Sequence, residues 1–294
     1  MPRPIVAIGI ATYGTQPPAW WQHTAVMVAK LPEYGIEIGG MLCGSSMAAD
    51  YNRNEVVKMF LNGHADYLLW IDTDNLIPFG GVKRLLETGK ELVSGLYNIK
   101  KPPYNPVAYW KQKDGNGYEP IHGYRPGQIV PVDMAGMGAC LVHRSVFEEI
   151  QRQYMLLVRH NGTTQPLHVD DVSGKVGEQR GAAPHVKNGQ YIETLRKLKP
   201  DKERTWPFFY LEHGRTEDVI FYEMAKRCGI QPFVDTGVVC PHIGSSEVTD
   251  ADYRDFIKVE KTKYQREQEW LEVLKSEGLT HETQQTEAKP TAAE

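Results

Sequence analysis

Two carboxylates follow an apolar run early in the chain. The run extends from Tyr67 to Ile71, and Asp72-Thr73-Asp74 comes directly after it. Residues two apart in an extended chain point to the same side, so both carboxylates would face one place. Two like charges at that spacing usually need a cation beside them. An Asp at a strand end often caps the next helix, but a cap explains one Asp and not two.

The elements around this motif predict an α/β fold. The apolar run is too short for a helix and predicts a strand buried on both faces, as in a mostly parallel sheet. Ligands of open α/β folds collect at the carboxyl edge of such a sheet, where the two Asp residues would lie. Further strands are expected at 4–11, 36–43, 91–97, 130–143, 207–211 and 231–239. Helices that flank the sheet are expected at 20–31, 47–62, 79–88, 144–153 and 219–228.

Composition and charge restrict the class of protein. The chain has 294 residues, and 41% of them are hydrophobic, which suffices for a sizeable core. The formal net charge of −4 gives no general attraction to nucleic acid, although such an average could hide a local basic groove. We expect a soluble, intracellular protein, because neither a leader nor an apolar run of membrane-spanning length is present. The four widely spaced cysteines favour reduced core thiols.

Several stretches lack a clear pattern. Residues 98–128 are rich in Gly, Pro and aromatic residues, which predicts loops and short hairpins that carry a substrate-specific surface. Residues 160–190 are polar and Gly-rich, which predicts a mobile loop or lid. One domain is therefore expected over residues 1–250. A charged helix at 251–277 and a disordered tail at 278–294 would follow it.

Other residues with suitable chemistry lie at predicted strand ends and helix starts. Arg53 belongs to a helix that should pack beside the strand of Asp72, so it could neutralise phosphate or the carboxylate pair. Tyr13 could stack on a base, or it could simply cover the sheet edge. Gly136 and Gly138 suggest a backbone that a ligand approaches closely, and a plain β-bulge would use them equally.

With these pieces in order, residues 4–244 resemble a glycosyltransferase of the GT-A type. This is a Rossmann-like fold that uses nucleotide-sugar donors, and the chain is similar to family-2-like members from bacteria and their phages. A lone D-x-D is weak evidence, but the order and spacing of all the motifs strengthen it. The motifs are Ala11-Thr12-Tyr13-Gly14, Arg53-Asn54, Asp72-Thr73-Asp74, Gly136-Met137-Gly138 with Ala139 to Val142, Arg144-Ser145-Val146-Phe147, Thr216-Glu217-Asp218-Val219 and His242.

The resemblance implies metal-dependent transfer of a sugar, with inversion, from a nucleotide diphosphate to an acceptor hydroxyl. UDP is the expected nucleotide by family habit. A divalent cation would stabilise the leaving diphosphate, with Asp74 as its direct ligand and Asp72 on the ribose or a metal-bound water. His242 would be a further ligand that modestly favours Mn²⁺ over Mg²⁺. A histidine held only by backbone carbonyls is the alternative.

The resemblance also assigns Asp218 as the general base, with Glu217 orienting the acceptor or a lid. The dipole of the following helix would lower the pKa of Asp218 and weaken it as a base unless burial offsets this effect. Asp133 would hydrogen-bond hydroxyls of the donor sugar. The donor-binding set implied in this way is Ala11, Thr12, Tyr13, Arg53, Asp72, Thr73, Asp74, Asp133, Gly136 and Gly138.

The acceptor stays open, and so do other classes of protein. A modified DNA base, a glycan and a protein side chain are all candidate acceptors in the cytoplasm of a bacterial or phage-infected cell. A haloacid-dehalogenase-type phosphatase has its D-x-D on the first strand and usually a small hydroxyl residue where Leu76 stands. A nucleotidyltransferase would need a Gly-rich, Arg-bearing loop, which 11–18 is not. A non-catalytic nucleotide-sugar-binding protein would bind a donor without turnover.

Overall fold

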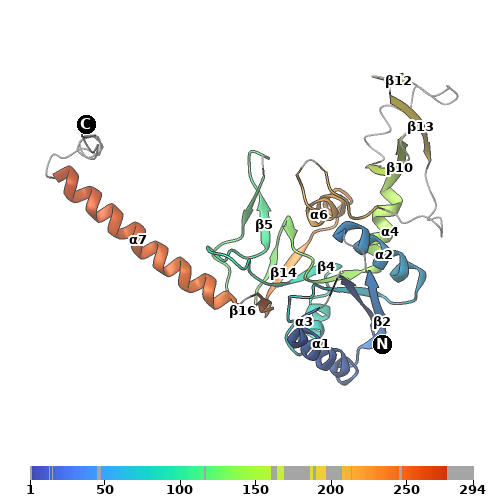
Figure 1. The fold of residues 1–294 in the computed structure, drawn as a ribbon, viewed down its shortest axis with the longest axis horizontal. Helices are drawn as coiled ribbons and strands as arrows, with labels where there is room; N and C mark the ends of the chain where they lie inside the picture. The colour runs from blue at the N-terminus through green and yellow to red at the C-terminus, as the bar shows by residue number, and fades with distance from the viewer. Residues whose placement is uncertain are drawn as a thin grey trace, which may run out of the picture.

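A computed structural model describes residues 2–12, 14, 16–44, 48–115, 117–159, 164–168, 186–187, 190–196, 207–212, 214–244 and 247–276. A seven-stranded sheet forms its centre (Figure 1). The strands are β1 (Ile5–Ala11), β2 (Glu37–Gly44), β3 (Tyr67–Ile71), β4 (Leu92–Leu96), β7 (Ile129–Pro131), β9 (Ala139–His143) and β14 (Phe233–Val239). Their order across the sheet is β2-β1-β3-β9-β4-β14-β7.

Five of these strands run in one direction. β1 is parallel to β2 and β3, and β4 is parallel to β14. β9 lies between β3 and β4 and is antiparallel to both, while β7 is antiparallel to β14. The expected α/β class with a mostly parallel sheet is therefore confirmed, and the arrangement is compatible with a Rossmann-like fold.

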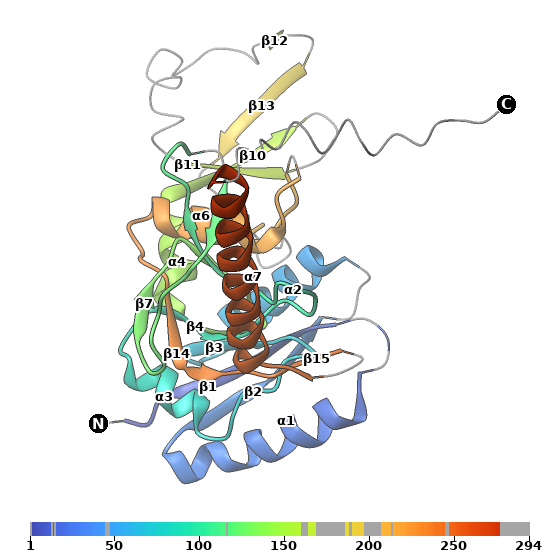
Figure 2. The same ribbon diagram turned by 90° about the vertical axis from the view of Figure 1, so that its left-hand side faces the viewer.

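Helices cover both faces of the sheet (Figures 1 and 2). They are α1 (Pro18–Lys30), the short η1 (Leu31–Tyr34), α2 (Ala49–Asn62), α3 (Gly81–Glu87), α4 (Arg144–Gln153) and α6 (Glu217–Arg227). Buried side chains of α2, α4 and α6 belong to one core cluster, and those of α1 and α3 belong to a second cluster on the other face. The sheet is therefore the middle of three layers.

Strand β3 shows why the sheet is buried on both sides. Leu68 and Trp70 point into the first core cluster, whereas Leu69 and Ile71 point into the second. Each of these four side chains is at most 1% exposed. Alternation of side chains in a strand sends successive residues to opposite faces, so an unbroken apolar run is needed only where both faces are covered. This buried strand fixes the position of the Asp residues that follow it.

Residues 130–143 and 160–190 differ from their predictions. The first range contains three strands in place of one, since β7 and β9 are separated by β8 (Met134–Ala135). β8 pairs with β5 (Ala108–Lys111), which pairs with β6 (Tyr118–Pro120). In the second range a loop was expected, but β11 (Thr164–His168) pairs with β10 (Tyr154–Arg159). β12 (Val186–Lys187) pairs with β13 (Gln190–Arg196), and the other residues of the range lie outside the described ones.

The strand predicted at 207–211 is wrong. These residues form irregular backbone, and Phe208 and Phe209 are both 1% exposed. Burial of both side chains does not require a strand here, because the Phe209 backbone bonds to a side chain and not to a neighbouring strand. The side chain of Asn54 forms two hydrogen bonds with the backbone of Phe209. Its Nδ2 donates to the carbonyl oxygen of Phe209 at 2.6 Å, and its Oδ1 accepts from the Phe209 amide at 3.1 Å.

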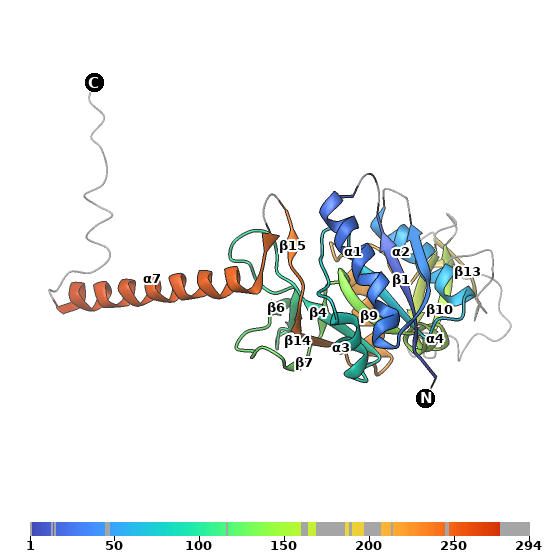
Figure 3. The same ribbon diagram turned by 90° about the horizontal axis from the view of Figure 1, so that it is seen from below.

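The chain leaves the sheet through the hairpin of β15 (His242–Ile243) and β16 (Glu247–Val248). α7 (Asp250–Ser276) follows and projects away from the body, as Figures 1 and 3 show. The predicted tail at 278–294 lies outside the described residues. In the described part of the chain, no helix combines the length and the apolar character that a membrane span requires. The cysteines are free; Cys140 and Cys240 are buried, whereas Cys43 is exposed.

Candidate active site

The turn after β3 is held by hydrogen bonds from several elements. The Asp72 amide donates to the carbonyl oxygen of Gly138 at 3.1 Å, which joins the turn to the start of β9. The Asp72 carbonyl oxygen accepts from Nε1 of Trp20 on α1 at 2.9 Å. The Asn75 amide donates to the same oxygen at 3.1 Å and closes the turn. These bonds fix the backbone from which Asp72 and Asp74 project.

Arg53 of α2 lies among three carboxylates. Its Nη2 is 3.1 Å from Oδ1 of Asp72, and its Nε is 3.5 Å from both Oε1 of Glu217 and Oδ1 of Asp218. The side chain is only 5% exposed, and the guanidinium lies 5.3 Å from the ring centre of Trp70. Burial opposes the charged form, but the three carboxylates outweigh it and raise the pKa of Arg53. A permanent positive charge therefore organises this edge of the sheet.

Asp218 differs from an ordinary carboxylate at a helix start. Burial raises its pKa to about 7, and the neighbouring Glu217 and Asp72 act in the same direction, although Arg53 opposes them. The backbone amide of Met137 donates to Oδ2 at 3.3 Å, while the buried Oδ1 has no hydrogen-bond partner. The helix dipole favours a low pKa, but here burial outweighs it. Asp218 can thus exchange a proton near neutral pH.

Asp74 forms a second group with Lys100 and His242. Lys100 Nζ lies 2.6 Å from Oδ2 of Asp74, and His242 Nε2 lies 3.3 Å from the same oxygen. Burial raises the pKa of Asp74, but the hydrogen bonds from His242 and Lys100 outweigh it and hold the pKa at about 2. The residues are aligned through the backbone, since the Ile243 amide donates to the carbonyl oxygen of Asp74 at 2.6 Å. Asp74 is therefore charged at every physiological pH.

The ring of His242 has a defined orientation. Its Nδ1 lies 2.7 Å from the carbonyl oxygen of Asn98, which can only accept, so Nδ1 carries the proton of the neutral ring. Nε2 can then donate to Asp74 only when the ring carries a second proton. In the neutral ring its lone pair faces the carboxylate, and a metal ion between the two atoms would remove that repulsion. A histidine that binds a metal usually donates its other N–H to such a carbonyl. The pair Asp74 and His242 fits a divalent cation in this respect.

The predicted three-ligand metal set is brought together only in part. Asp74 and His242 are in contact, but the carboxylate of Asp72 pairs with Arg53. Among the described residues, no group of three or more His, Cys, Asp or Glu side chains is arranged to hold a metal ion. Lys100 supplies the positive charge beside Asp74.

The glycine pair is explained by side chains of the protein itself. A Cβ at Gly136 would lie 1.8 Å from the hydroxyl oxygen of Tyr97, and one at Gly138 would lie 2.3 Å from Nδ2 of Asn75. The Tyr97 hydroxyl also accepts a hydrogen bond from the Gly138 amide at 3.1 Å. Only glycine leaves room for these contacts. Close approach is therefore required here, but the approaching groups belong to Tyr97 and Asn75.

Several buried polar atoms at this edge have no hydrogen-bond partner. They are Nη1 of Arg53, both side-chain polar atoms of Asn75, Oδ1 of Asn98 and Oδ1 of Asp218. An unsatisfied buried polar atom costs about 1–3 kcal/mol, so such atoms are uncommon in a folded protein. Their concentration around the Asp72 turn marks a place where a polar ligand or water would supply the missing bonds.

Of the other predicted donor-binding residues, Ala11, Thr12 and Thr73 lie near the Asp72 turn or Arg53, whereas the carboxylate of Asp133 is bonded elsewhere. Ala11 ends β1, and the Thr12 carbonyl oxygen accepts from Nδ2 of Asn52 at 3.2 Å, which places this strand end beside α2 and Arg53. Thr73 lies within the Asp72 turn. Tyr13 lies outside the described residues. Asp133 is bonded elsewhere, because its carboxylate accepts from the Lys111 amide at 2.6 Å and pairs with Lys226.

Tyr97, Asn75 and Lys100 were not predicted as site residues. Tyr97 follows β4 and Asn75 follows the Asp pair, so the rule that ligands gather at the carboxyl edge would have included both. Lys100 lies in a Pro-rich loop, and its spacing carries no comparable signal.

The chain matches no family model and no curated protein. Its similarity to solved structures is low. A197 from STIV has a TM-score of 0.41 and 13% identity, over 82% of this chain and 86% of that chain. A structure assigned as a glucose-1-phosphate thymidylyltransferase from Bacillus anthracis, in complex with a sucrose, has a TM-score of 0.27 and 15% identity. The match covers 50% of this chain and 74% of that chain. A glycosyltransferase involved in the glycosylation of the major capsid of PBCV-1 has a TM-score of 0.24 and 14% identity. The match covers 49% of this chain and 62% of that chain. The neighbours thus include a glycosyltransferase and a nucleotidyltransferase, at similarities that assign neither activity to this chain.

Proposed function

We propose that this chain is a GT-A-like glycosyltransferase that moves a sugar from a nucleotide diphosphate, with UDP as the nucleotide, to an acceptor hydroxyl. The observation that carries the proposal is the cluster around Arg53. It places a carboxyl group with a pKa of about 7, Asp218, beside a buried cation and the Asp72 turn. A group that exchanges protons near neutrality, next to fixed charges, suits acid–base catalysis of group transfer.

Asp218 acts as the general base of this reaction. It takes the proton of the acceptor hydroxyl while the acceptor oxygen bonds to the anomeric carbon and the bond from that carbon to the diphosphate breaks, with inversion. Arg53 and Glu217 hold Asp218 in position. General-base catalysis of this kind contributes about 10²–10⁴ in rate.

The leaving diphosphate lies near the positive charges of this edge. Lys100 and Arg53 are the side chains that could face its oxygens, and Asp74 with His242 would hold a divalent cation, Mn²⁺ or Mg²⁺. Such an ion would neutralise charge on the diphosphate. Asp72, Thr73 and the end of β1 would contact the nucleoside. Asp133 is left out of this site, because Lys111 and Lys226 already occupy its carboxylate.

The test uses the full chain with a panel of UDP-, GDP- and TDP-sugars and MnCl₂, with release of nucleoside diphosphate as the readout. One donor is expected to be hydrolysed slowly, with water in place of the acceptor hydroxyl. Asp218→Asn should lower this hydrolysis about 10²-fold or more, while the affinity for the nucleotide changes little. Asp255→Asn on α7, whose side chain is 73% exposed, is the matched control.

Two results would contradict the proposal. Tight nucleotide binding without turnover of any donor would identify a binding protein. Hydrolysis of p-nitrophenyl phosphate that is lost in Asp72→Asn would identify a phosphatase, in which Asp72 is the nucleophile.

A further inference from the structure

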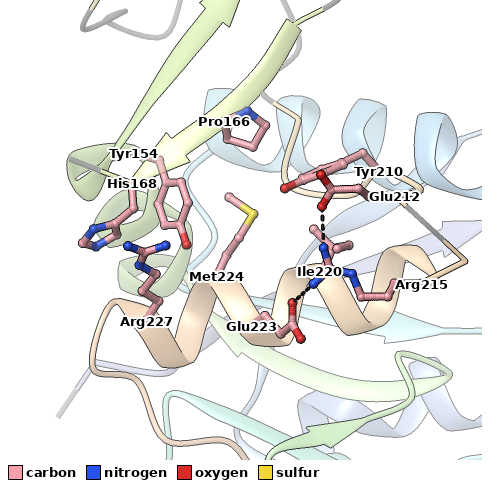
Figure 4. Close-up of a pocket in the computed structure, with 10 residues that line it drawn as sticks. All are labelled: Tyr154, Pro166, His168, Tyr210, Glu212, Arg215, Ile220, Glu223, Met224 and Arg227. Atoms are coloured by element: carbon pink, nitrogen blue, oxygen red, sulfur yellow. Dashed lines mark hydrogen bonds and ion pairs between the residues drawn. The ribbon is translucent and has the colours of Figure 1, made fainter. Parts of the chain in front are cut away.

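A cavity of about 230 Å³ lies on the side of α6 that faces β10 and β11 (Figure 4). Its wall on α6 comes from Ile220, Glu223, Met224 and Arg227. These positions are three, four and seven residues apart, so they form one face of the helix. The opposite wall comes from β10 and β11, and one end is closed by Tyr210, Glu212 and Arg215.

This cavity is separate from the cluster around Arg53. In an α-helix each residue turns by about 100°, so Asp218 and Tyr222 lie on the side of α6 opposite to Glu223 and Arg227. The contacts agree, because the Tyr222 hydroxyl lies 3.0 Å from Oγ of Ser94 within the sheet. α6 therefore stands between the acidic cluster and the cavity.

The polar groups of the cavity are fixed in place and balanced in charge. Arg215 joins two carboxylates, with Nη1 2.5 Å from Oε2 of Glu223 and Nη2 2.5 Å from Oε2 of Glu212. The Tyr118 hydroxyl donates to the other oxygen of Glu223 at 2.9 Å. Together with Arg227 the lining holds two acidic and two basic side chains, so it attracts neither anions nor cations as a class. Such an array of fixed donors and acceptors suits a neutral ligand that can both donate and accept hydrogen bonds.

The remaining lining is aromatic and apolar. Tyr154 and His168 pack edge to face, with ring centres 5.1 Å apart, and Tyr210 lies across the cavity from them in Figure 4. Met224 and Ile220 form an apolar floor between the rings. Aromatic and apolar surface packs against the C–H faces of a ring, while the charged groups meet its hydroxyls. The volume is below the range of about 300–1,000 Å³ typical of sites for drug-sized ligands, so one ring fits best.

We propose that this cavity is a carbohydrate-binding site that takes one pyranose unit of a neutral glycan. It anchors the glycan on the outer face of α6, apart from the proposed transfer reaction. Hydroxyls of the sugar bond to Glu223, Arg215 and Arg227, and its C–H face packs on the rings and on Met224.

The experiment is saturation-transfer difference NMR on the full chain with methyl glycosides of glucose, galactose, mannose and N-acetylglucosamine at millimolar concentration. At least one glycoside is expected to bind. Glu223→Gln and Tyr210→Ala should each weaken it about tenfold or more, because each removes a contact to the bound ring. Asp218→Asn should leave this binding unchanged, since its side chain lies across the helix. Thermal unfolding of every variant verifies that it is folded.

Three results would overturn the proposal. They are the absence of any saturation transfer from the four glycosides, binding that both cavity variants retain, and binding that is lost in Asp218→Asn. The last result would place the sugar in the acidic cluster. Failure of the donor-hydrolysis assay leaves this experiment unaffected, because its readout is sugar binding alone.

Discussion

Arg53 Nη2 lies 3.1 Å from Oδ1 of Asp72, although the two residues are 19 positions apart on different elements. The helix of the arginine packs on one face of the sheet, and the strand before the aspartate lies inside that sheet, between β1 and β9. The ion pair therefore depends on the docking of α2 onto β3. Three carboxylates share this one buried cation, so the free energy of unfolding should depend strongly on its presence.

Arg53→Met should destabilise the protein by about 3 kcal/mol at neutral pH, because it leaves Asp72, Glu217 and Asp218 without a buried counter-charge. The loss should shrink at pH 5, since Asp218, with a pKa of about 7, is then protonated and no longer adds to the repulsion. Urea unfolding at pH 5 and pH 7.5 measures both effects. Lys258→Met, which alters a lysine that is 77% exposed, serves as the control and should change little. An equal loss at both pH values would show that packing, and not charge, is responsible.

The pKa of Asp218 predicts a pH dependence of stability with a definite sign. Its ordinary value is 3.8 and its value in the folded chain is about 7, so between them only the folded state holds the proton. Stability from this group is complete at the acidic end of that window and falls as pH rises, by up to about 1.4 kcal/mol per pH unit. Asp218→Asn stays neutral and should remove this fall, whereas Asp255→Asn should keep it. Parallel curves for the wild type and Asp218→Asn would refute the raised pKa.

Gly136→Ala should cost about 1–3 kcal/mol, because its Cβ would overlap the hydroxyl of Tyr97. Adding Tyr97→Phe removes the nearest atom and should restore part of the loss, since the ring carbon at 2.7 Å and Val107 at 2.8 Å remain. A double-mutant cycle in urea measures this coupling. Gly63→Ala is the matched control, because the nearest atom to its Cβ is 3.4 Å away. Strict additivity of the two changes would disprove the contact.

His242→Ala should weaken Mn²⁺ binding by about tenfold or more, because it removes one of two proposed ligands. Loss of the free Mn²⁺ signal in electron paramagnetic resonance measures binding without any donor or acceptor. Lys100→Met should strengthen binding, since it removes the ammonium that now pairs with Asp74. Equal affinity in the wild type and His242→Ala would exclude His242 as a ligand.

The sequence predicted single strands and helices better than it predicted which strands lie side by side in the sheet. The apolar run of β3 and the docking of Arg53 beside it followed from patterns of side chains within single elements. The roles of Tyr97 and Asn75 depend on β9 lying between β3 and β4, and no periodicity reveals such an insertion. The pKa of Asp218 was equally hidden, because the helix dipole is visible in a sequence and burial is not.

Two further gaps have a similar origin. Phe208 and Phe209 looked like part of a strand, but the hydrogen bonds of the Phe209 backbone go to the side chain of Asn54, which is 155 residues away in the chain. The cavity on α6 needs β11, which lies in a stretch predicted to be a loop. Both depend on long-range contacts, which local propensity cannot supply.

Trp20 lies on α1, on the face of the sheet opposite to Arg53, and its indole N–H donates to the backbone carbonyl of Asp72. Hydrogen bonding at an indole nitrogen alters the energy of its excited state, so this side chain is a built-in optical reporter. A movement of the aspartate turn that breaks this bond is expected to shift the emission wavelength of Trp20, and the difference spectrum between the wild type and Trp20→Phe would isolate that signal from the other tryptophans.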